Sequence, residues 1–189
     1  MGATNQVQRY TKTAMVLHWL MALAIISGWV MGNYMVDLKF SPDKLQLYSW
    51  HKWIGFTVFM LALLRLVWRW THKPPPPLPG QPAWQLHAAS ITHALFYALF
   101  LAVPISGWLF SSSTGFPLVY LGLLPIPDLI GKSPELKDTL KAVHWYLSTG
   151  LAALVVLHIG AAIKHTVVSR DTTLARMLPW GRPDAHSQR

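Results

Sequence analysis

The chain has 189 residues, of which 52% are hydrophobic and only 12% are charged, with a formal net charge of +9. A charged share about half that of a soluble domain favours a membrane protein. The positive residues flank apolar runs and do not form the basic face that nucleic-acid binding requires. There is no cysteine, which excludes disulfides, cysteine-ligated iron–sulfur clusters and covalent haem attachment through a C-x-x-C-H motif.

Four apolar segments are predicted to cross the membrane as helices, over residues 14–36, 48–70, 88–111 and 140–166. Each can cross a hydrocarbon core of about 30 Å at about 1.5 Å per residue. The first segment has no cleavage-site layout, so we interpret it as a retained helix and not as a removed signal. The second contains Lys52 and Arg65, whose long side chains can reach the two membrane interfaces.

The connectors contain residues that end helices. Lys73 is followed by four prolines, which cannot continue the second helix. A serine-rich run from Ser111 to Gly115 ends the third helix. The residues from there to Pro134 are apolar but interrupted by prolines, so we expect an ordered interfacial loop and not a fifth span. The sequence therefore predicts an all-α fold, an integral membrane four-helix bundle that forms a single transmembrane domain over residues 1–189.

Lysine and arginine in the short connectors predict the orientation in the membrane. Ten of them fall in the two tails and around the second connector: Arg9, Lys12, Arg65, Arg69, Lys73, Lys164, Arg170, Arg176, Arg182 and Arg189. The other six fall on the opposite side, mixed with acids: Lys39, Lys44, Lys52, Lys132, Lys137 and Lys141. We therefore expect both short terminal tails to be cytoplasmic.

Four of the histidines inside the predicted spans, His18, His51, His144 and His158, are the candidate ligands, because polar groups within a membrane are costly and usually functional. Distances from the nearest charged residues place His18 and His158 near the cytoplasmic side, and His51 and His144 near the outer side. His144 and His158 are 14 residues apart, so they share one helix face and are separated by about 21 Å along the axis. The last helix can therefore offer one ligand at each of two levels, and an earlier helix can complete each site.

Haem suits these two sites. Neutral imidazole is a good ligand for iron, and the core between facing helices of a bundle is where such cofactors bind. We predict two noncovalent, bis-histidine haem b groups, one held by His18 and His158 and the other by His51 and His144. Because both axial positions are then filled, we expect electron transfer without ligand exchange at the iron.

Cations and small residues near these histidines have matching interpretations. Arg65 lies 14 residues after His51, on about the same helix face, and is the candidate partner for the propionates of the cytoplasmic haem. Lys52 is the corresponding candidate for the outer haem. Glycines that would admit a flat ring near the ligands are Gly28, Gly55, Gly107, Gly150 and Gly160.

Several alternatives stay open at this point. An intramembrane histidine can instead form a hydrogen bond between helices, and His165 is a rival to His158 two turns further along the same helix face. His93 is either structural or adjacent to a haem or quinone. The tryptophans beside the candidate ligands are interpreted first as interfacial anchors and second as porphyrin neighbours. His72 and His186 are interpreted as solvated.

The motifs around these residues follow one another in a specific order. They are LHWLM around His18, WHKWIG around His51, LLRLVWRWTHKPPPP, HALFYALFLAVPISGW, VHWYLSTG around His144, LHIGAAIKH around His158, and DTTLARMLP in the tail. This ordered set, from Arg9 to Pro179, resembles the bacterial cytochrome b561 family. The resemblance implies a two-haem protein of the bacterial inner membrane, ligated by the same four histidines, with ubiquinone as substrate.

The resemblance also implies an activity. Some members resemble superoxide oxidases, so we expect an oxidoreductase, of the superoxide oxidase or quinone reductase type, that exchanges electrons with the quinone pool. Superoxide is the candidate donor, and outer lysines such as Lys52 would attract this anion. The quinone site is sought in the outer loop, around Ser112, Phe116 and Tyr120.

Two other functions remain alternatives. The first is the cytochrome b membrane subunit of a larger respiratory dehydrogenase, which would receive electrons from a partner protein. The second is a haem-free metal-ion transporter or membrane scaffold that uses the same histidines. Transport paths usually contain intramembrane carboxylates, and the predicted spans contain none. In every case the membrane lipid surrounds the helices.

Overall fold

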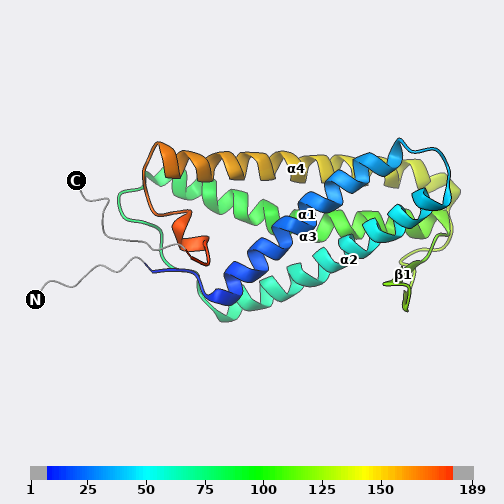
Figure 1. Ribbon diagram of the computed structural model, residues 1–189, viewed down its shortest axis with the longest axis horizontal. Helices are drawn as coiled ribbons and strands as arrows, with labels where there is room; N and C mark the ends of the chain where they lie inside the picture. Colours follow the sequence, from blue (N-terminus) through cyan, green and yellow to red (C-terminus); the bar gives the residue numbers. More distant parts are fainter. Residues whose placement is uncertain (1–7, 181–189) are drawn as a thin grey trace, which may run out of the picture.

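The computed structural model describes residues 8–180 and is dominated by four long helices (Figure 1). They are α1 (Lys12–Val36), α2 (Pro42–Thr71), α3 (Ala83–Thr114) and α4 (Lys137–Val167). All four are long and apolar enough to cross a membrane, and each contains one of the ranges expected from the sequence. The all-α four-helix prediction is therefore confirmed, while Arg182, His186 and Arg189 lie outside the described residues.

The helices extend beyond the hydropathic segments because polar residues cap their first turns. The side chain of Thr11 accepts a hydrogen bond from the backbone of Ala14, at 3.2 Å, where α1 begins. Ser41 accepts in the same way from Lys44, at 3.2 Å, and Pro42 occupies the first turn of α2. α3 ends at Gly115, whose φ of 74° is the left-handed conformation that glycine adopts without strain. These polar turns carry no hydropathy signal, although they are helical.

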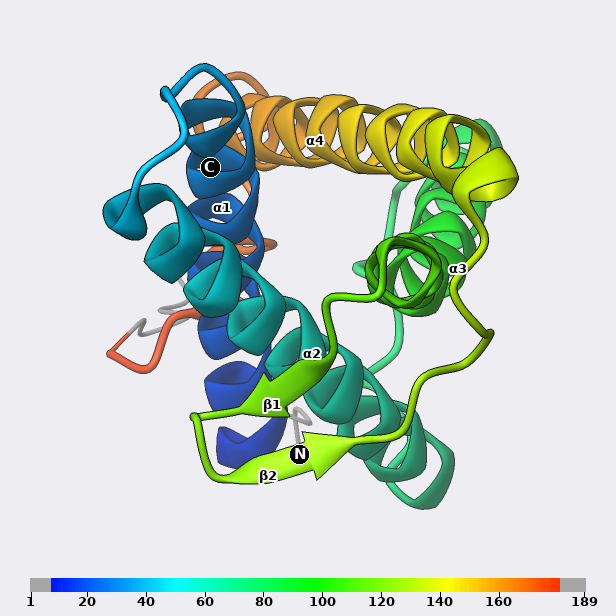
Figure 2. The same cartoon turned by 90° about the vertical axis from the view of Figure 1, so that its right-hand side faces the viewer.

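The helices are arranged in a ring when they are viewed from one end (Figure 2). α1 packs against α2, α2 against α3, and α3 against α4, whereas α4 approaches α1 sparingly and α2 hardly at all. One small core cluster joins the helices, made of Met21, Ala62, Phe96, Phe100 and Leu151. Much of the remaining apolar surface is exposed, as expected for helices that face lipid. α4 is therefore held to the bundle mainly through α3.

The two ends of the bundle differ, and we call them the tail end and the loop end. The described termini lie at the tail end, and the connector between α3 and α4 lies at the loop end (Figure 1). This connector forms an antiparallel hairpin of β1 (Leu118–Tyr120) and β2 (Leu124–Ile126), followed by the short 3-10 helix η1 (Pro134–Leu136). Leu121 and Gly122 make the hairpin turn with positive φ angles of 54° and 73°.

The hairpin is held against α2 by two side-chain hydrogen bonds. The indole Nε1 of Trp53 donates to the carbonyl of Val119 at 2.7 Å, and Thr57 Oγ1 bonds the hydroxyl of Tyr120 at 2.9 Å. The structure thus has an ordered loop here, as expected, and no fifth long helix within residues 8–180. The hairpin itself is not apparent from the sequence.

The tail end is closed by the segment after α4, which includes the 3-10 helix η2 (Ala175–Met177). Arg176 is buried there and donates to the carbonyls of Gln8, at 2.7 Å, and Pro76, at 2.8 Å. Trp19 donates to the carbonyl of Met177 at 2.9 Å, and Arg9 donates to the carbonyl of Leu178. The N-terminal segment, the proline connector and the C-terminal segment are therefore held together at one point.

Candidate functional site

The structure brings the four candidate ligand histidines together as two pairs. The rings of His18, on α1, and His158, on α4, have centroids 6.1 Å apart. The rings of His51, on α2, and His144, on α4, are also 6.1 Å apart. The first pair lies toward the tail end and the second toward the loop end. These are the two pairs that the depth of each histidine in its helix predicts.

The spacing within each pair leaves room for one metal atom. An imidazole nitrogen lies about 2 Å from a first-row metal, so a shared metal puts the two ring centroids roughly 6 Å apart. No hydrogen bond joins the two rings of either pair among the described residues. In residues 8–180, no three His, Cys, Asp or Glu side chains gather as a bare-ion site would need, whereas haem needs only two axial ligands.

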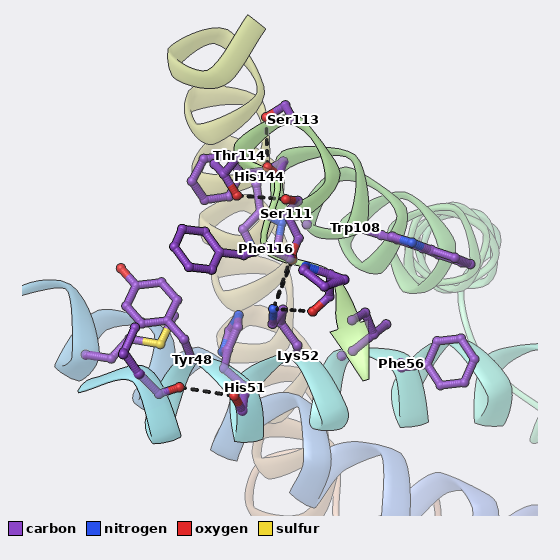
Figure 3. A pocket seen from close by; sticks show the side chains of 18 of the residues that line it. Tyr48, His51, Lys52, Phe56, Trp108, Ser111, Ser113, Thr114, Phe116 and His144 are labelled. Carbon is purple, nitrogen blue, oxygen red and sulfur yellow. Dashed lines mark hydrogen bonds between the residues drawn. The ribbon is translucent and has the colours of Figure 1, made fainter. Parts of the chain in front are cut away.

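A large cavity opens beside the loop-end pair (Figure 3). Its volume is about 840 Å³, and both His51 and His144 line it, which is the size range of pockets for whole cofactors and ligands. Aromatic side chains such as Phe56 and Trp108 form much of its wall, together with Gly55 and Gly107. The cavity is suited to a large, flat and mostly apolar group.

His144 is held in a fixed orientation by the third helix. Its Nδ1 donates to the carbonyl of Val103, at 3.1 Å, and to the hydroxyl of Ser106, at 3.0 Å, while this hydroxyl donates to the same carbonyl. A Cβ on Gly107 would lie only 2.9 Å from His144 Cε1, so the ring requires glycine at this position. Because Nδ1 is the donor, Nε2 is left free to bind a metal.

His51 has a comparable position against α1. A Cβ on Gly32 would lie 3.0 Å from His51 Cε1. The Nδ1 atom of His51 is buried and has no hydrogen-bond partner among the described residues. Of the glycines suggested by the sequence, Gly107 contacts a histidine and Gly28 would meet Ile54, whereas Gly55, Gly150 and Gly160 face open space. Gly32 was not identified from the sequence, because only the crossing of α1 and α2 puts it beside His51.

The tail-end pair has a third histidine beside it. The ring centroid of His93, on α3, lies 6.2 Å from that of His158, almost the same separation as within the pair itself. Arg65 Nη2 lies 3.3 Å from His18 Nδ1, so the candidate propionate partner also lies beside this pair. The ring of Trp19 stands edge-on to His18 at 5.2 Å.

His165, the rival to His158, has a different partner. Its Nδ1 lies 2.6 Å from Asp171 Oδ2, and the backbone of Thr173 donates to the other carboxylate oxygen at 2.9 Å. Burial alone raises the pKa of Asp171, but the hydrogen bonds from Thr173 and His165 outweigh it and hold the pKa below its ordinary value. His165 therefore fastens the segment after α4 and does not join the tail-end pair.

Lys52 lies on the wall of the loop-end cavity and is tied to the loop. Its ammonium donates to the carbonyls of Phe116, at 3.3 Å, and Pro117, at 3.1 Å, and to Ser111 Oγ at 3.4 Å (Figure 3). Of the three loop residues considered for a quinone, Phe116 lines the cavity. Ser112 donates to the carbonyl of Trp108, and the Tyr120 hydroxyl is bonded to Thr57, so these two hydroxyls serve the loop structure.

Comparison with known proteins shows the family to which the chain belongs. Residues 9–180 match the model of the prokaryotic cytochrome b561 family. The chain is 32% identical to cytochrome b561 homolog 2 of Escherichia coli (strain K12), over 94% of this chain and 95% of that protein. It is 30% identical to cytochrome b561 homolog 1 of the same organism, over 92% and 98% of the two chains. It is also 30% identical to a probable superoxide oxidase CybB of Yersinia pestis, over 91% and 97%. The chain therefore belongs to the prokaryotic cytochrome b561 family, and it is a membrane b-type cytochrome that acts in electron transfer.

Proposed function

We propose that the protein holds two haem b groups, one between His18 and His158 and the other between His51 and His144, and passes electrons between them. The observation that carries this proposal is the common 6.1 Å separation of the ring centroids in both pairs. The two levels are joined by one continuous helix, α4, along which the histidines lie about 21 Å apart. Bound haem supplies one-electron redox chemistry at each level.

The residues around each pair have separate roles in this proposal. At the loop end, Val103 and Ser106 fix the tautomer of His144, which presents Nε2 to the cofactor. Gly107 and Gly32 allow the two loop-end imidazoles to lie close to α3 and α1. With haem bound, the two histidines of each pair would hold the iron from both sides and leave it no free position for dioxygen or water, which would favour outer-sphere electron transfer.

Arg65 has a proposed role at the tail-end site. In the structure its guanidinium donates to His18 Nδ1, since arginine has no acceptor. A neutral histidine that binds iron through Nε2 carries its proton on Nδ1, which then cannot accept from arginine. We infer that Arg65 donates to a haem propionate when the cofactor is bound, and that this charge-assisted contact replaces the one to His18.

We further propose that the loop end faces the periplasm and receives electrons there, while both tails are cytoplasmic. Support comes from the distribution of the 16 Lys and Arg residues, because ten of them fall in the two tails and around the connector between α2 and α3. The chain would exchange electrons with the quinone pool of a bacterial inner membrane. A quinone head group needs an apolar slot with few polar handles, and the cavity wall at Phe116 is the candidate.

Superoxide is the proposed electron donor. The relative from Yersinia pestis is named as a probable superoxide oxidase. Of the described residues that line the loop-end cavity, the charged ones are four lysines, Lys44, Lys52, Lys132 and Lys137, so the field there attracts an anion. Two superoxide ions would each lose one electron to give dioxygen, and the two electrons with two protons would convert one quinone to quinol.

The ligand assignment is tested by counting haems in the purified protein. Haem content and the dithionite-reduced spectrum are measured for His18→Ala, His158→Ala, His51→Ala and His144→Ala. The His18 and His158 variants are expected to lose the tail-end haem, and the His51 and His144 variants are expected to lose the loop-end haem. His87→Ala is the control, because the hydrogen bond that His87 makes within the described part of the chain goes to the carbonyl of Ala83 in its own helix. Full retention in any of the four would remove that residue from the ligand set.

The substrate assignment needs a separate measurement. Superoxide decay and quinol formation are followed with the purified holoprotein and a short-chain ubiquinone, and we expect both to depend on the protein. A holoprotein with two haems that reacts with neither would exclude superoxide as the donor. Reduction only by an added soluble dehydrogenase would instead favour the membrane-subunit alternative.

A further inference from the structure

A second cavity, of about 270 Å³, lies at the tail end of the bundle. It is formed by the last turns of α2, the start of the proline connector, Tyr97 of α3, the N-terminal segment and Met177. Among residues 8–180, its charged lining consists of Arg9, Arg65, Arg69 and Lys73, without any Asp or Glu. The cavity is thus a small, cationic site separate from the loop-end cavity.

The positive charge of this cavity is not balanced by protein carboxylates in the part of the chain that the structure describes. The ion pair in the described part of the chain joins His165 and Asp171, and neither residue lines this cavity. The guanidinium groups of Arg65 and Arg69 both lie over the ring of Tyr97, at 5.8 Å and 5.6 Å from its centroid. Several cations that gather around one small space without acids favour an anion inside it.

The cations are ordered along α2 from the interior of the bundle to its end. Arg65 reaches inward to His18 and belongs to the tail-end haem site proposed above. Arg69 lies one turn further on and Lys73 follows the end of the helix, at the depth where head groups meet the hydrocarbon. The outer part of the cavity therefore opens at the membrane interface.

The wall beside these outer cations suits a lipid. Trp68 and His72 stack with ring centroids 3.7 Å apart and planes 5° from parallel, and the prolines Pro74 and Pro75 continue the wall. Tryptophan at this depth is a usual neighbour of lipid head groups. The cavity volume is slightly below the roughly 300–1,000 Å³ typical of pockets for whole small molecules. It therefore suits a group smaller than such ligands, such as one phosphate head group.

We propose that this cavity binds the phosphate group of an anionic phospholipid, through Arg69 and Lys73 with Arg9 beside them. Basic pockets next to membrane helices recognise such head groups through charge and hydrogen bonds. The site would fasten α2 and the proline connector to the lipid surface. It does not depend on which histidines bind haem.

The test uses the purified holoprotein and compares phospholipid with free inorganic phosphate, so that the two sources of a phosphate group are distinguished. Retained lipid is measured by native mass spectrometry after incubation with phosphatidylglycerol or phosphatidylcholine, and thermal stabilisation is measured with each lipid and with inorganic phosphate. We expect preferential retention of phosphatidylglycerol. Arg69→Gln with Lys73→Gln should lower its apparent affinity roughly thirtyfold, at about fivefold for each cation.

The control variant is Lys164→Gln with Arg170→Gln, which removes two charges at the same end but outside the cavity. It should retain phosphatidylglycerol like the unchanged chain. Equal retention of both lipids, or an unchanged affinity in the Arg69 and Lys73 variant, would overturn the proposal. Stabilisation by inorganic phosphate equal to that by phosphatidylglycerol would overturn the lipid assignment.

Haem content is measured in the same samples. We expect the Arg69 and Lys73 variant to keep both haems while it loses lipid. Loss of a haem in this variant would mean that propionates fill the cavity, and the lipid proposal would then be wrong. Failure of the histidine variants above would leave the lipid result unaffected, so the two proposals can fail separately.

Discussion

Gly107 lies directly against the imidazole of His144, with only 2.9 Å between His144 Cε1 and the place where a Cβ would be. This is closer than ordinary van der Waals contact, and the hydrogen bonds from His144 Nδ1 to Val103 and Ser106 restrict how far the imidazole can move. The identity of one small residue on α3 therefore controls the position of a side chain on α4.

Gly107→Ala should displace His144 and weaken haem binding at the loop end. Overpacking of this kind costs about 1–3 kcal/mol, so we expect partial loss of one haem together with a lower melting temperature. Haem content per chain and thermal unfolding measure the two effects. The control is Gly131→Ala in the loop, because none of the described residues has an atom within 4 Å of a Cβ there; an equal loss in both variants would contradict the packing argument.

Ser106→Ala tests the hydrogen bond that orients His144. The imidazole Nδ1 keeps its bond to the carbonyl of Val103 and loses the one to the Ser106 hydroxyl. With one hydrogen bond fewer at Nδ1, the imidazole donates less electron density to the iron, so the reduction potential of the loop-end haem should rise. Haem affinity at this site should fall by about tenfold at most. Redox titration followed by visible spectroscopy measures the change. An unchanged potential would show that Val103 alone fixes the ring.

Arg65→Met should affect the other haem. If Arg65 donates to a propionate, its loss removes a charge-assisted bond worth about 1.5–3 kcal/mol. We expect a roughly tenfold to hundredfold weaker tail-end haem and an unchanged loop-end haem, with partial recovery in Arg65→Lys. Competition with a haem-scavenging protein measures both affinities. Equal weakening of the two haems would point to general destabilisation of the bundle.

The link between His165 and Asp171 predicts how the tail responds to acid. The pKa of Asp171 is held below its ordinary value, so the carboxylate contributes stability above that ordinary value, about 3.9. This contribution is lost as the pH falls through the lower, folded-state value. The segment from Thr172 to Trp180 should therefore stay docked from neutral pH down to about pH 4 and then loosen. Hydrogen exchange of this segment measures the docking.

Asp171→Asn removes the same charge at neutral pH and keeps the size of the side chain. We expect faster exchange in the segment after α4 and no acid-dependent step. The haem spectrum should be unchanged, since His165 lies outside both histidine pairs. If the variant keeps the step near pH 4, another group is responsible for it.

The sequence was sufficient for the four helices and for the pairing of the histidines. Long apolar runs indicate the spans, and the 14-residue interval between His144 and His158 fixes their common face and axial spacing through the helix repeat alone. The partners His18 and His51 follow from depth, which charged residues at the helix ends reveal. None of these inferences needs knowledge of which helices touch.

Other features depend on contacts that no local pattern records. Gly32 approaches His51 only because α1 crosses α2 there, and His93 lies near His158 because α3 packs against α4. Lys52 has the right depth for a haem partner, yet its ammonium is bonded to loop carbonyls whose position depends on the unforeseen hairpin. Helix crossing and loop conformation are tertiary properties, so these roles had to come from the structure.

Each histidine pair takes one member from α1 or α2 and the other from α4. If the polypeptide were divided within the proline connector, the first fragment would keep His18 and His51 and the second would keep His144 and His158. Neither fragment alone would contain a complete pair. Biogenesis must therefore bring the late-inserted second hairpin of helices alongside the first before either pair can form.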